Sequence, residues 1–361
     1  MKRIFLIGLL FLWGSLTSAQ NKTKNLIIVT LDGLRWQEVF RGADSTLVNI
    51  KEYNPDKKGI TANFIRESPE ARRSLLMPFF WSTIVKKGQI YGNRDLGNKA
   101  EVANTFRFSY PGYNELFTGF PDPRVSSNDK IPNSNTNLLE YINKQKGFEG
   151  KVIAFTSWDV FPFILNDKRS GIIVNSGLTD LNIPGMSERL KLLNEMQHLS
   201  PGFVAEDMRL DVITYQFGKQ YMIDKKPRVL YLGFDETDDL AHQGNYKMYL
   251  QQAKKTDAIL ADLWDYLQSD PFYKDQTTLV ITSDHGRGEM PLDTWRSHGE
   301  KTQGAEQVWF AVMGPDTPVK GEIRTPTTIY HKQLAQTFSE LLGLDFKSGA
   351  GHEVGTGINL K

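Results

Sequence analysis

The sequence predicts an α/β fold, a three-layer sandwich with a mostly parallel central sheet and helices on both faces. Short continuous apolar runs are typical of strands that are buried in a parallel sheet. Helical patterns fall between these runs, as connections between parallel strands require. The length of 361 residues, with 40% hydrophobic and 24% charged residues, allows a substantial core.

Five apolar runs are predicted as buried parallel strands: 25–32, 151–157, 228–235, 278–284 and 308–314. Three of them end in a carboxylate, at Asp32, Asp235 and Asp284. Because ligands of open α/β sheets bind outside the carboxyl ends of strands, we expect these acids at one edge of the sheet. Gathered carboxylates repel one another, so a divalent metal ion is the natural partner for them.

Two segments show helical periodicity. In the stretch 245–270, apolar residues recur at helical spacing and predict a helix that faces the sheet. The stretch 330–344 predicts a second helix, which ends at Gly343. Residues 159–226 show no clear pattern, and we expect them to form an inserted cap over the strand ends.

The N-terminus has the pattern of a signal peptide over residues 1–19, with a basic start, an apolar stretch and small residues before Ala19. The apolar stretch "IFLIGLLFLW" is shorter than the ~20 residues that span a bilayer, so cleavage is favoured over anchoring. We therefore expect a periplasmic or secreted protein with one catalytic domain over 20–361, and no membrane span after cleavage.

Composition limits the partners and the chemistry. Lys+Arg number 43 and Asp+Glu 42, so net charge favours neither a nucleic-acid polymer nor an anionic membrane as partner. The chain contains no cysteine, which excludes disulfides, catalytic thiols and thiolate metal sites. Nothing in the sequence predicts an oligomeric state.

Three segments combine carboxylates with histidine. Asp284 and His285 directly follow a predicted strand in "TSDHGRG", where Gly286 permits a tight turn. Asp238 and His242 are four residues apart, so on a helical turn they share one face. Such pairs can ligate metal, although each could equally be a surface turn or a helix start.

His298 in "WRSHGE" could join the same site through a loop. Asp235 and Asp239 remain competing ligands. The other histidines, His198, His331 and His352, lie outside these segments and are interpreted as structural.

Ser109 opens the stretch "SYPGYNELFTG" and has two interpretations. It could be an ordinary serine of a Pro-Gly turn. It could also be a nucleophile at a helix N-terminus. If Pro111 lies in the first helical turn, backbone N–H groups would support the oxygens of a bound phosphoryl group.

In chain order, Asp32, Ser109, Asp238 with His242, Asp284 with His285, and His298 resemble the alkaline phosphatase superfamily. The closer resemblance is to its nucleotide pyrophosphatase/phosphodiesterase-like and phosphoglycerate-mutase-like branches. The segment "SYPGYNELFTG" is similar to the nucleophile segment of the phosphodiesterase branch, and "IYHKQLAQTFSELLGLDF" to the C-terminal helix of the superfamily. The resemblance implies an alkaline-phosphatase-like sandwich.

The resemblance also implies roles. One metal ion would be held by Asp32, Asp284 and His285, with Ser109 as the nucleophile and a further ligand; Asp238, His242 and His298 would hold the second. Mixed imidazole and carboxylate ligands favour zinc, with manganese and iron as alternatives. The implied function is an exported hydrolase of small-molecule phosphate monoesters or diesters, which forms a phosphoseryl intermediate.

Four residues are candidate substrate contacts: Asn114, Arg107, Arg287 and Arg296. Two departures bear on the substrate. Gly112 stands where the phosphodiesterase branch usually has an asparagine after the proline, so diester preference stays open. Tyr113 stands where the sulfatase motif has an arginine, which disfavours a sulfatase, the first alternative. The second alternative is an exported metal-binding protein without catalysis, which would have no use for the hydroxyl of Ser109.

Overall fold

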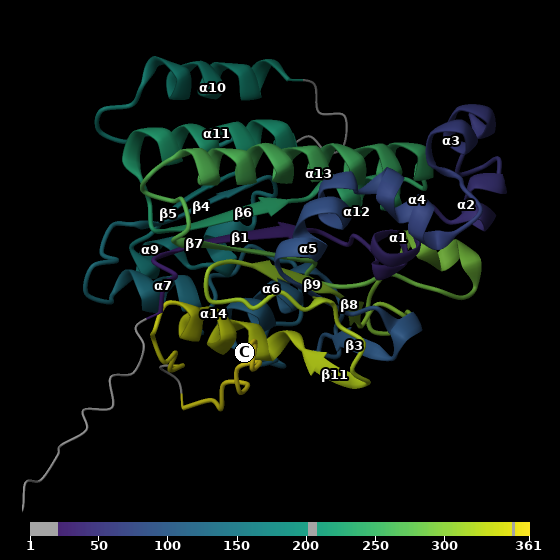
Figure 1. Cartoon of the computed structure of the whole chain (residues 1–361). Helices are drawn as coiled ribbons and strands as arrows, with labels where there is room; N and C mark the ends of the chain where they lie inside the picture. The colour runs from purple at the N-terminus through teal and green to yellow at the C-terminus, as the bar shows by residue number, and fades with distance from the viewer. Residues whose placement is uncertain (1–20, 201–207, 349–350) are drawn as a thin grey trace, which may run out of the picture.

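The computed structural model describes residues 21–200, 208–348 and 351–361 (Figure 1). The predicted signal peptide over 1–19 lies outside the described residues. Within the described part, an eight-stranded sheet forms the centre of the molecule. In spatial order its strands are β10 (Gly321–Glu322), β2 (Gln89–Tyr91), β9 (Phe310–Met313), β7 (Thr277–Thr282), β1 (Asn25–Leu31), β6 (Val229–Phe234), β4 (Val152–Thr156) and β5 (Ile173–Ser176).

The predicted sandwich with a mostly parallel sheet is confirmed. Strand β1 is paired in parallel with β6 on one side and β7 on the other. Strands β4 and β5 extend the parallel part beyond β6. Four of the predicted runs therefore form adjacent parallel strands, and their carboxyl ends meet at one edge.

The fifth predicted strand is corrected. The run 308–314 divides at Trp309: β8 (Gln307–Val308) joins a small sheet with β3 (Asn98–Glu101) and β11 (Thr327–Tyr330), and β9 pairs antiparallel with β7. Parallel neighbours are usually joined by a crossover helix. The connection between β7 and β8 instead contains the short 3₁₀ helix η3 (Leu292–Arg296) and carries three of the predicted metal ligands, Asp284, His285 and His298.

Helices cover both faces of the sheet (Figure 1). On one face lie α11 (Asp211–Lys225) and α13 (Tyr246–Ser269), and on the other lie α6 (Ser109–Thr118), α7 (Leu138–Asn143) and α14 (Leu334–Leu341). Alternate residues of β1 enter the two separate apolar cores, Ile27 and Val29 on one side and Leu26 and Ile28 on the other. This division follows from the two-residue period of a strand.

The long helix predicted over 245–270 is confirmed as α13. The predicted C-terminal helix begins with the 3₁₀ helix η4 (His331–Gln333) and continues as α14, with Gly343 in a left-handed conformation just beyond its end. Several short helices were not predicted: α1 (Trp36–Arg41), α2 (Ser45–Asn49), α3 (Lys57–Phe64), α4 (Pro69–Leu76), the π-helix η1 (Phe80–Ile84), α5 (Val85–Lys87) and the 3₁₀ helix η2 (Arg94–Leu96).

The described residues of the segment 159–226 do not form a separate cap. The segment contains α8 (Phe161–Ile164), α9 (Asp167–Ser170), β5, α10 (Glu188–Leu199) and α11. Strand β5 is an edge strand of the central sheet, and α11 packs on β4 and β6. The irregular appearance of this segment has a physical cause, since its early elements are too short to show a period.

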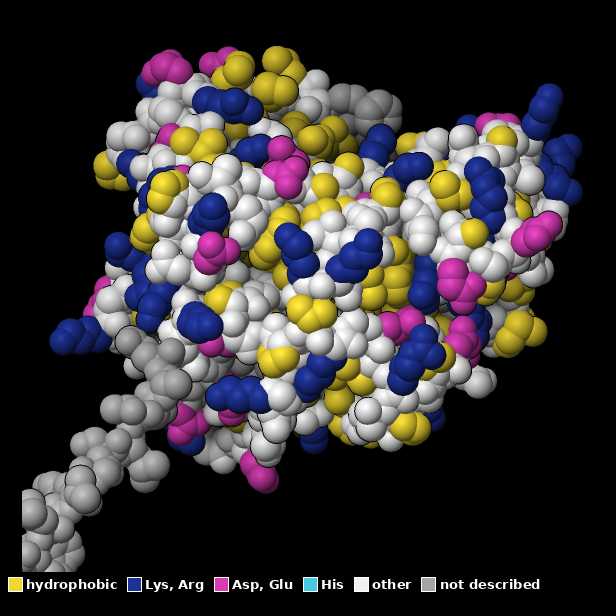
Figure 2. All heavy atoms as spheres, viewed as in Figure 1, with side chains coloured by type: hydrophobic (Ala, Val, Ile, Leu, Met, Phe, Trp, Pro, Cys, Tyr) yellow, Lys and Arg dark blue, Asp and Glu magenta, His cyan; other side chains and the backbone are white. Residues whose placement is uncertain are grey.

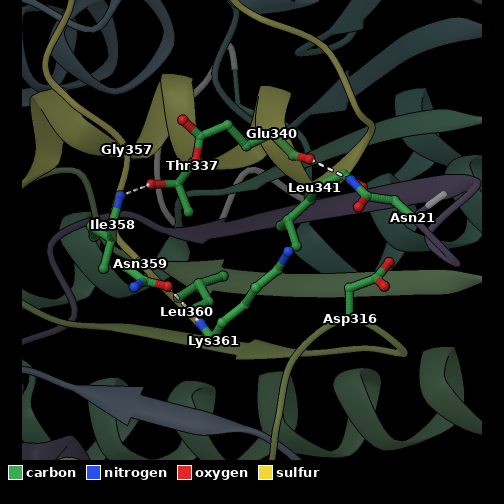
Figure 3. Close-up of a pocket in the computed structure, with 10 residues that line it drawn as sticks. All are labelled: Asn21, Asp316, Thr337, Glu340, Leu341, Gly357, Ile358, Asn359, Leu360 and Lys361. Atoms are coloured by element: carbon green, nitrogen blue, oxygen red, sulfur yellow. Dashed lines mark hydrogen bonds between the residues drawn. The ribbon is translucent and has the colours of Figure 1, made fainter. Parts of the chain in front are cut away.

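Asn21, the first described residue, lies at the amino end of β1, away from the predicted site. Its side-chain amide donates hydrogen bonds to the carbonyl oxygens of Glu340 (2.6 Å) and Leu341 (3.1 Å) at the end of α14. These residues and the C-terminal residues line a cavity of about 370 Å³ (Figure 3).

The surface shows charges of both signs. On the face in Figure 2, basic and acidic side chains are interspersed, and neither sign gathers in one area. Among the described helices, none combines the length and apolar character that crossing a membrane requires.

Candidate metal centre and nucleophile

The predicted ligands meet at the carboxyl edge of the central strands. Asp32 directly follows β1, and Asp284 and His285 follow β7 after Ser283. Helix α12 (Glu236–His242), which follows the neighbouring strand β6, carries Asp238 and His242. His298 comes from the loop after η3. Because β6, β1 and β7 are adjacent, ligands that are more than 200 residues apart in the chain come together.

The first ligand set contains Asp32, Asp284 and His285, and its candidate ligand atoms lie within 4.8 Å of one another. The Nε2 atom of His285 is 3.2 Å from Oδ1 of Asp32 and 3.4 Å from Oδ2 of Asp284. Nδ1 of His285 lies 2.9 Å from the carbonyl oxygen of Gly286. A proton on Nδ1 would donate to this carbonyl and leave the Nε2 lone pair for a metal ion.

The second set contains Asp238, His242 and His298. The Nε2 atoms of the two histidines are 2.9 Å apart, and Oδ2 of Asp238 is 3.0 Å from Nε2 of His242. The imidazole rings of His285 and His298 have centroids 4.0 Å apart, so the two sets adjoin. Both sets have the composition that the sequence predicted.

Ser109 is the first residue of α6 and lies beside the first set. Its Oγ is 3.4 Å from Nε2 of His285, and the residue is buried, with 6% exposure. The backbone N–H groups that were expected to support phosphoryl oxygens are not all available. Pro111 has no N–H, and the N–H of Tyr110 donates to Oδ1 of Asn128 at 3.0 Å.

The electrostatics of the ligand groups match a cation site. Burial, followed by the charge of Asp238, raises the pKa of Asp32 well above its usual range, and burial followed by Asp32 does the same for Asp284. Burial and then the neighbouring His285 lower the pKa of His298. Oδ1 of Asp32 and Oδ2 of Asp284 are buried without a hydrogen-bond partner. Unpartnered buried oxygens beside imidazoles are the donor set that a divalent metal ion satisfies.

Two glycines allow the close approach of these segments. Gly33 has φ of 58°, and a Cβ atom there would lie 2.4 Å from Oδ1 of Asp238. At Gly112 a Cβ atom would lie 2.5 Å from the carbonyl oxygen of Asp284. The asparagine typical of the phosphodiesterase branch would therefore clash at position 112, which gives the departure a steric cause.

The four candidate substrate contacts have different surroundings. Asn114 is buried in α6, where its Oδ1 accepts hydrogen bonds from Asn133 (3.0 Å) and Asn135 (3.1 Å). Arg287 is also buried, and its guanidinium bonds Oδ1 of Asp238 and the carbonyl oxygen of Trp295. The hydrogen bonds of both side chains are thus made inside the protein, which disfavours both residues as substrate contacts.

Arg107 and Arg296 remain partly exposed. Arg107 lies two residues before Ser109 and pairs with Glu306 at 3.3 Å. Arg296 pairs loosely with Glu52 at 3.6 Å. Of the four candidate substrate contacts, these two arginines are the ones whose side chains remain partly exposed.

Three residues beside the ligands were missed by sequence reasoning. Tyr113 donates from its hydroxyl to Oδ2 of Asp32 (3.0 Å), and Thr237 donates to the backbone oxygen of Asp32 (2.6 Å). The side-chain oxygen of Asn128 accepts a 3.0 Å hydrogen bond from the backbone N–H of Tyr110. None of them belongs to a metal-binding residue type with a readable spacing, so only their placement in the fold marks them.

The competing ligand Asp235 and the three histidines that were interpreted as structural lie outside the two ligand sets. Asp235 is buried beside Asp32, and burial raises its pKa well above the usual range. His198 pairs with Asp180 at 2.8 Å, His331 contacts Thr282 at 3.0 Å, and His352 stacks on Phe120.

Comparisons with solved structures agree with this fold. Wild-type alkaline phosphatase PafA is 10% identical, with a TM-score of 0.62 over 94% of this chain and 98% of that one. The lipoteichoic acid synthase LtaP from Listeria monocytogenes is 12% identical, with a TM-score of 0.58 over 95% of this chain and 76% of its own. The 2-O GAG sulfatase BT1596 is 14% identical, with a TM-score of 0.52 over 91% and 72%.

A protein of the alkaline phosphatase superfamily from Vibrio parahaemolyticus also has this fold, at 13% identity and a TM-score of 0.51 over 91% of this chain and 68% of its own. No curated protein sequence matches the chain. The family model for type I phosphodiesterase / nucleotide pyrophosphatase, however, matches residues 50–303, well over half of the chain. The chain belongs to the type I phosphodiesterase / nucleotide pyrophosphatase family.

Proposed function

We propose that this protein is an exported, two-metal hydrolase of phosphoric esters that acts through a phosphoseryl intermediate on Ser109. One observation carries the proposal. The Oγ atom of Ser109 lies 3.4 Å from Nε2 of His285, at the start of a helix and beside two adjoining sets of metal ligands. A site that only bound metal would not need a hydroxyl there.

The first set, Asp32, Asp284 and His285, and the second set, Asp238, His242 and His298, would each hold one ion, with zinc favoured by their imidazole and carboxylate atoms. Bound zinc lowers the pKa of a coordinated hydroxyl and stabilises developing charge on phosphoryl oxygens. Asp32, Asp238 and Asp284 supply three negative charges, which two divalent cations exceed. The Arg287 guanidinium beside Asp238 adds further positive charge, so the loaded site attracts an anionic ester.

The reaction proceeds in two displacements. The Ser109 Oγ–phosphorus bond forms as the bond from phosphorus to the leaving oxygen breaks, and the leaving group departs as an alcohol. Water then cleaves the phosphoserine, which releases phosphate from a monoester and regenerates Ser109.

The substrate is proposed to be a small-molecule phosphate ester, with monoesters and diesters both accommodated by the chemistry. Arg107 and Arg296, the two partly exposed arginines among the four candidates, are the proposed contacts to the rest of the substrate. We further propose that the protein is periplasmic or secreted. Cleavage after Ala19 would leave Asn21 in its contact with the end of α14, and intact-mass analysis of the exported chain tests the cleavage position.

The experiment compares p-nitrophenyl phosphate, bis-p-nitrophenyl phosphate and p-nitrophenyl sulfate on the purified mature chain, together with its metal content. We expect two zinc ions per chain and turnover of a phosphate ester. Ser109→Ala should keep the zinc and lose the turnover. A clear preference for the sulfate ester, or full activity of Ser109→Ala, would contradict the proposal. Bound zinc without turnover of any ester would favour a metal-binding protein.

A further inference from the structure

A buried carboxylate on the nucleophile helix is not used by the proposed chemistry. Glu115 lies six residues after Ser109 on α6 and is fully buried. Its carboxylate accepts hydrogen bonds from the backbone N–H groups of Ala103 (2.8 Å), Asn104 (2.8 Å) and Lys332 (3.0 Å). The side-chain amide of Asn104 donates a further bond at 2.9 Å. A carboxylate with this many short bonds is held rigidly and holds its donors in turn.

These bonds control the loop that leads into Ser109. Oδ1 of Asn104 accepts a 2.8 Å hydrogen bond from the N–H of Arg107. Arg107 has φ of 56°, a left-handed conformation that an arginine adopts only when its surroundings impose it. Asn104 therefore connects the carboxylate of Glu115 to the turn two residues before the nucleophile.

The same turn contacts the second ligand set. The carbonyl oxygen of Arg107 accepts a 3.0 Å hydrogen bond from the N–H of Gly299, the residue that follows His298. The backbone next to the nucleophile is thus joined directly to the backbone next to a metal ligand. Glu115 also accepts the hydrogen bond from the backbone N–H of Lys332. The preceding residue, His331, contacts Thr282, which lies two residues before Asp284.

We propose that Glu115 and Asn104 are positioning residues that set the distance between Ser109 and His298. They touch no ligand atom, and they act through the hydrogen bonds from Glu115 to Asn104, from Asn104 to Arg107 and from Arg107 to Gly299. The inference about catalysis rests on the proposed function, but the inference about the position of His298 does not. Misplacement of reacting groups by about 1 Å can reduce rates ~100-fold, so a loosened turn should affect the chemical step.

The test uses Asn104→Ala in the full mature chain. This substitution leaves the three backbone bonds of Glu115 in place, whereas Glu115→Ala would strand four buried donors and could prevent folding. The matched control is Asn137→Ala. Asn137 is buried and directly precedes α7. Its side-chain amide donates a hydrogen bond to the carbonyl oxygen of Leu165, and its side-chain oxygen accepts one from the backbone N–H of Glu140.

Each variant is assayed for thermal stability, for kcat and KM on p-nitrophenyl phosphate, and for zinc affinity by calorimetric titration of the metal-free protein. For Asn104→Ala we expect kcat to fall ~10-fold or more with little change in KM, and one of the two zinc affinities to weaken several-fold. Asn137→Ala should lose stability but keep kcat and both zinc affinities.

The inference is overturned if Asn104→Ala loses stability like the control while kcat and both zinc affinities stay at wild-type values. If the wild-type chain hydrolyses no phosphate ester, the proposed function fails. The zinc titration then still decides whether Asn104 positions His298.

Discussion

The hydroxyl of Tyr113 donates a 3.0 Å hydrogen bond to Oδ2 of Asp32, so a residue on the nucleophile helix orients a metal ligand at the end of β1. Tyr113 stands at the position of the arginine in the sulfatase motif. Here its bond leaves the other oxygen of Asp32, which has no hydrogen-bond partner, to face Nε2 of His285.

Tyr113→Phe tests this contact. Hydrogen bonds to ligating carboxylates affect metal affinity, and their loss should weaken zinc binding at the first ligand set ~10-fold. Competition with a chelator measures the affinity. Tyr273→Phe is the control, because Tyr273 is equally buried and its hydroxyl donates to Pro227, away from the site. Equal zinc affinity in both variants would show that the bond to Asp32 has no such effect.

Gly112→Ala tests the contact between α6 and the loop after β7. The added Cβ atom would lie 2.5 Å from the carbonyl oxygen of Asp284, so the start of α6 must shift. We expect a stability loss of about 1–3 kcal/mol and a fall in kcat, measured by thermal unfolding and ester hydrolysis. Unchanged kcat in a folded variant would mean that Ser109 tolerates displacement of its helix.

Arg287 and Arg296 should give opposite results when each is replaced by methionine. Loss of the buried Arg287 removes the guanidinium that pairs with Asp238 and should cost about 3–5 kcal/mol of stability in the metal-free protein. Loss of the partly exposed Arg296 should change stability by less than about 0.5 kcal/mol and raise KM for phosphate esters ~10-fold. Denaturant titrations and steady-state kinetics distinguish the structural role of Arg287 from the substrate-contact role of Arg296. A raised KM without a stability loss in Arg287→Met would instead assign the substrate contact to Arg287.

His331 predicts an acid-sensitive contribution to stability. Burial, followed by the charge of His285, lowers the pKa of His331 to about 3, whereas the unfolded chain has a value of about 6.5. The unfolded state therefore binds more protons between these values, and stability present above pH 6.5 is lost as the pH falls towards 3.

His331→Gln removes this titration and can retain the contact with Thr282. Between pH 7 and pH 4.5, the metal-free wild-type protein should lose about 2 kcal/mol more unfolding free energy than the variant. Urea titrations at both pH values measure the difference. Parallel losses in the two proteins would show that His331 is not buried in its neutral form.

The sequence predicted the parallel centre of the fold for a clear reason, and the family resemblance implied the two candidate ligand sets whose members lie together in the structure. Strands such as β1 are continuous apolar runs, and each ends in residues whose chemistry is visible without a structure. The order of Asp32, Ser109, Asp238, Asp284 and His298 was informative because few kinds of site need those residue types in that order. The direction of β9 and the place of β5 were not predictable, because short strands have no periodic signal and their pairing depends on partners distant in the chain.

By itself, the sequence determined which residue types could bind metal, since these follow from side-chain chemistry and from position after a buried strand, and the family resemblance singled out Ser109 as the candidate nucleophile. Only the tertiary structure decided which candidates work together. It placed Arg287 against Asp238 rather than at the surface, and it paired Asn114 with buried asparagines. It also brought Tyr113 and Thr237 into contact with Asp32. These assignments depend on packing and on hydrogen bonds between segments far apart in the chain, which leave no local pattern in the sequence.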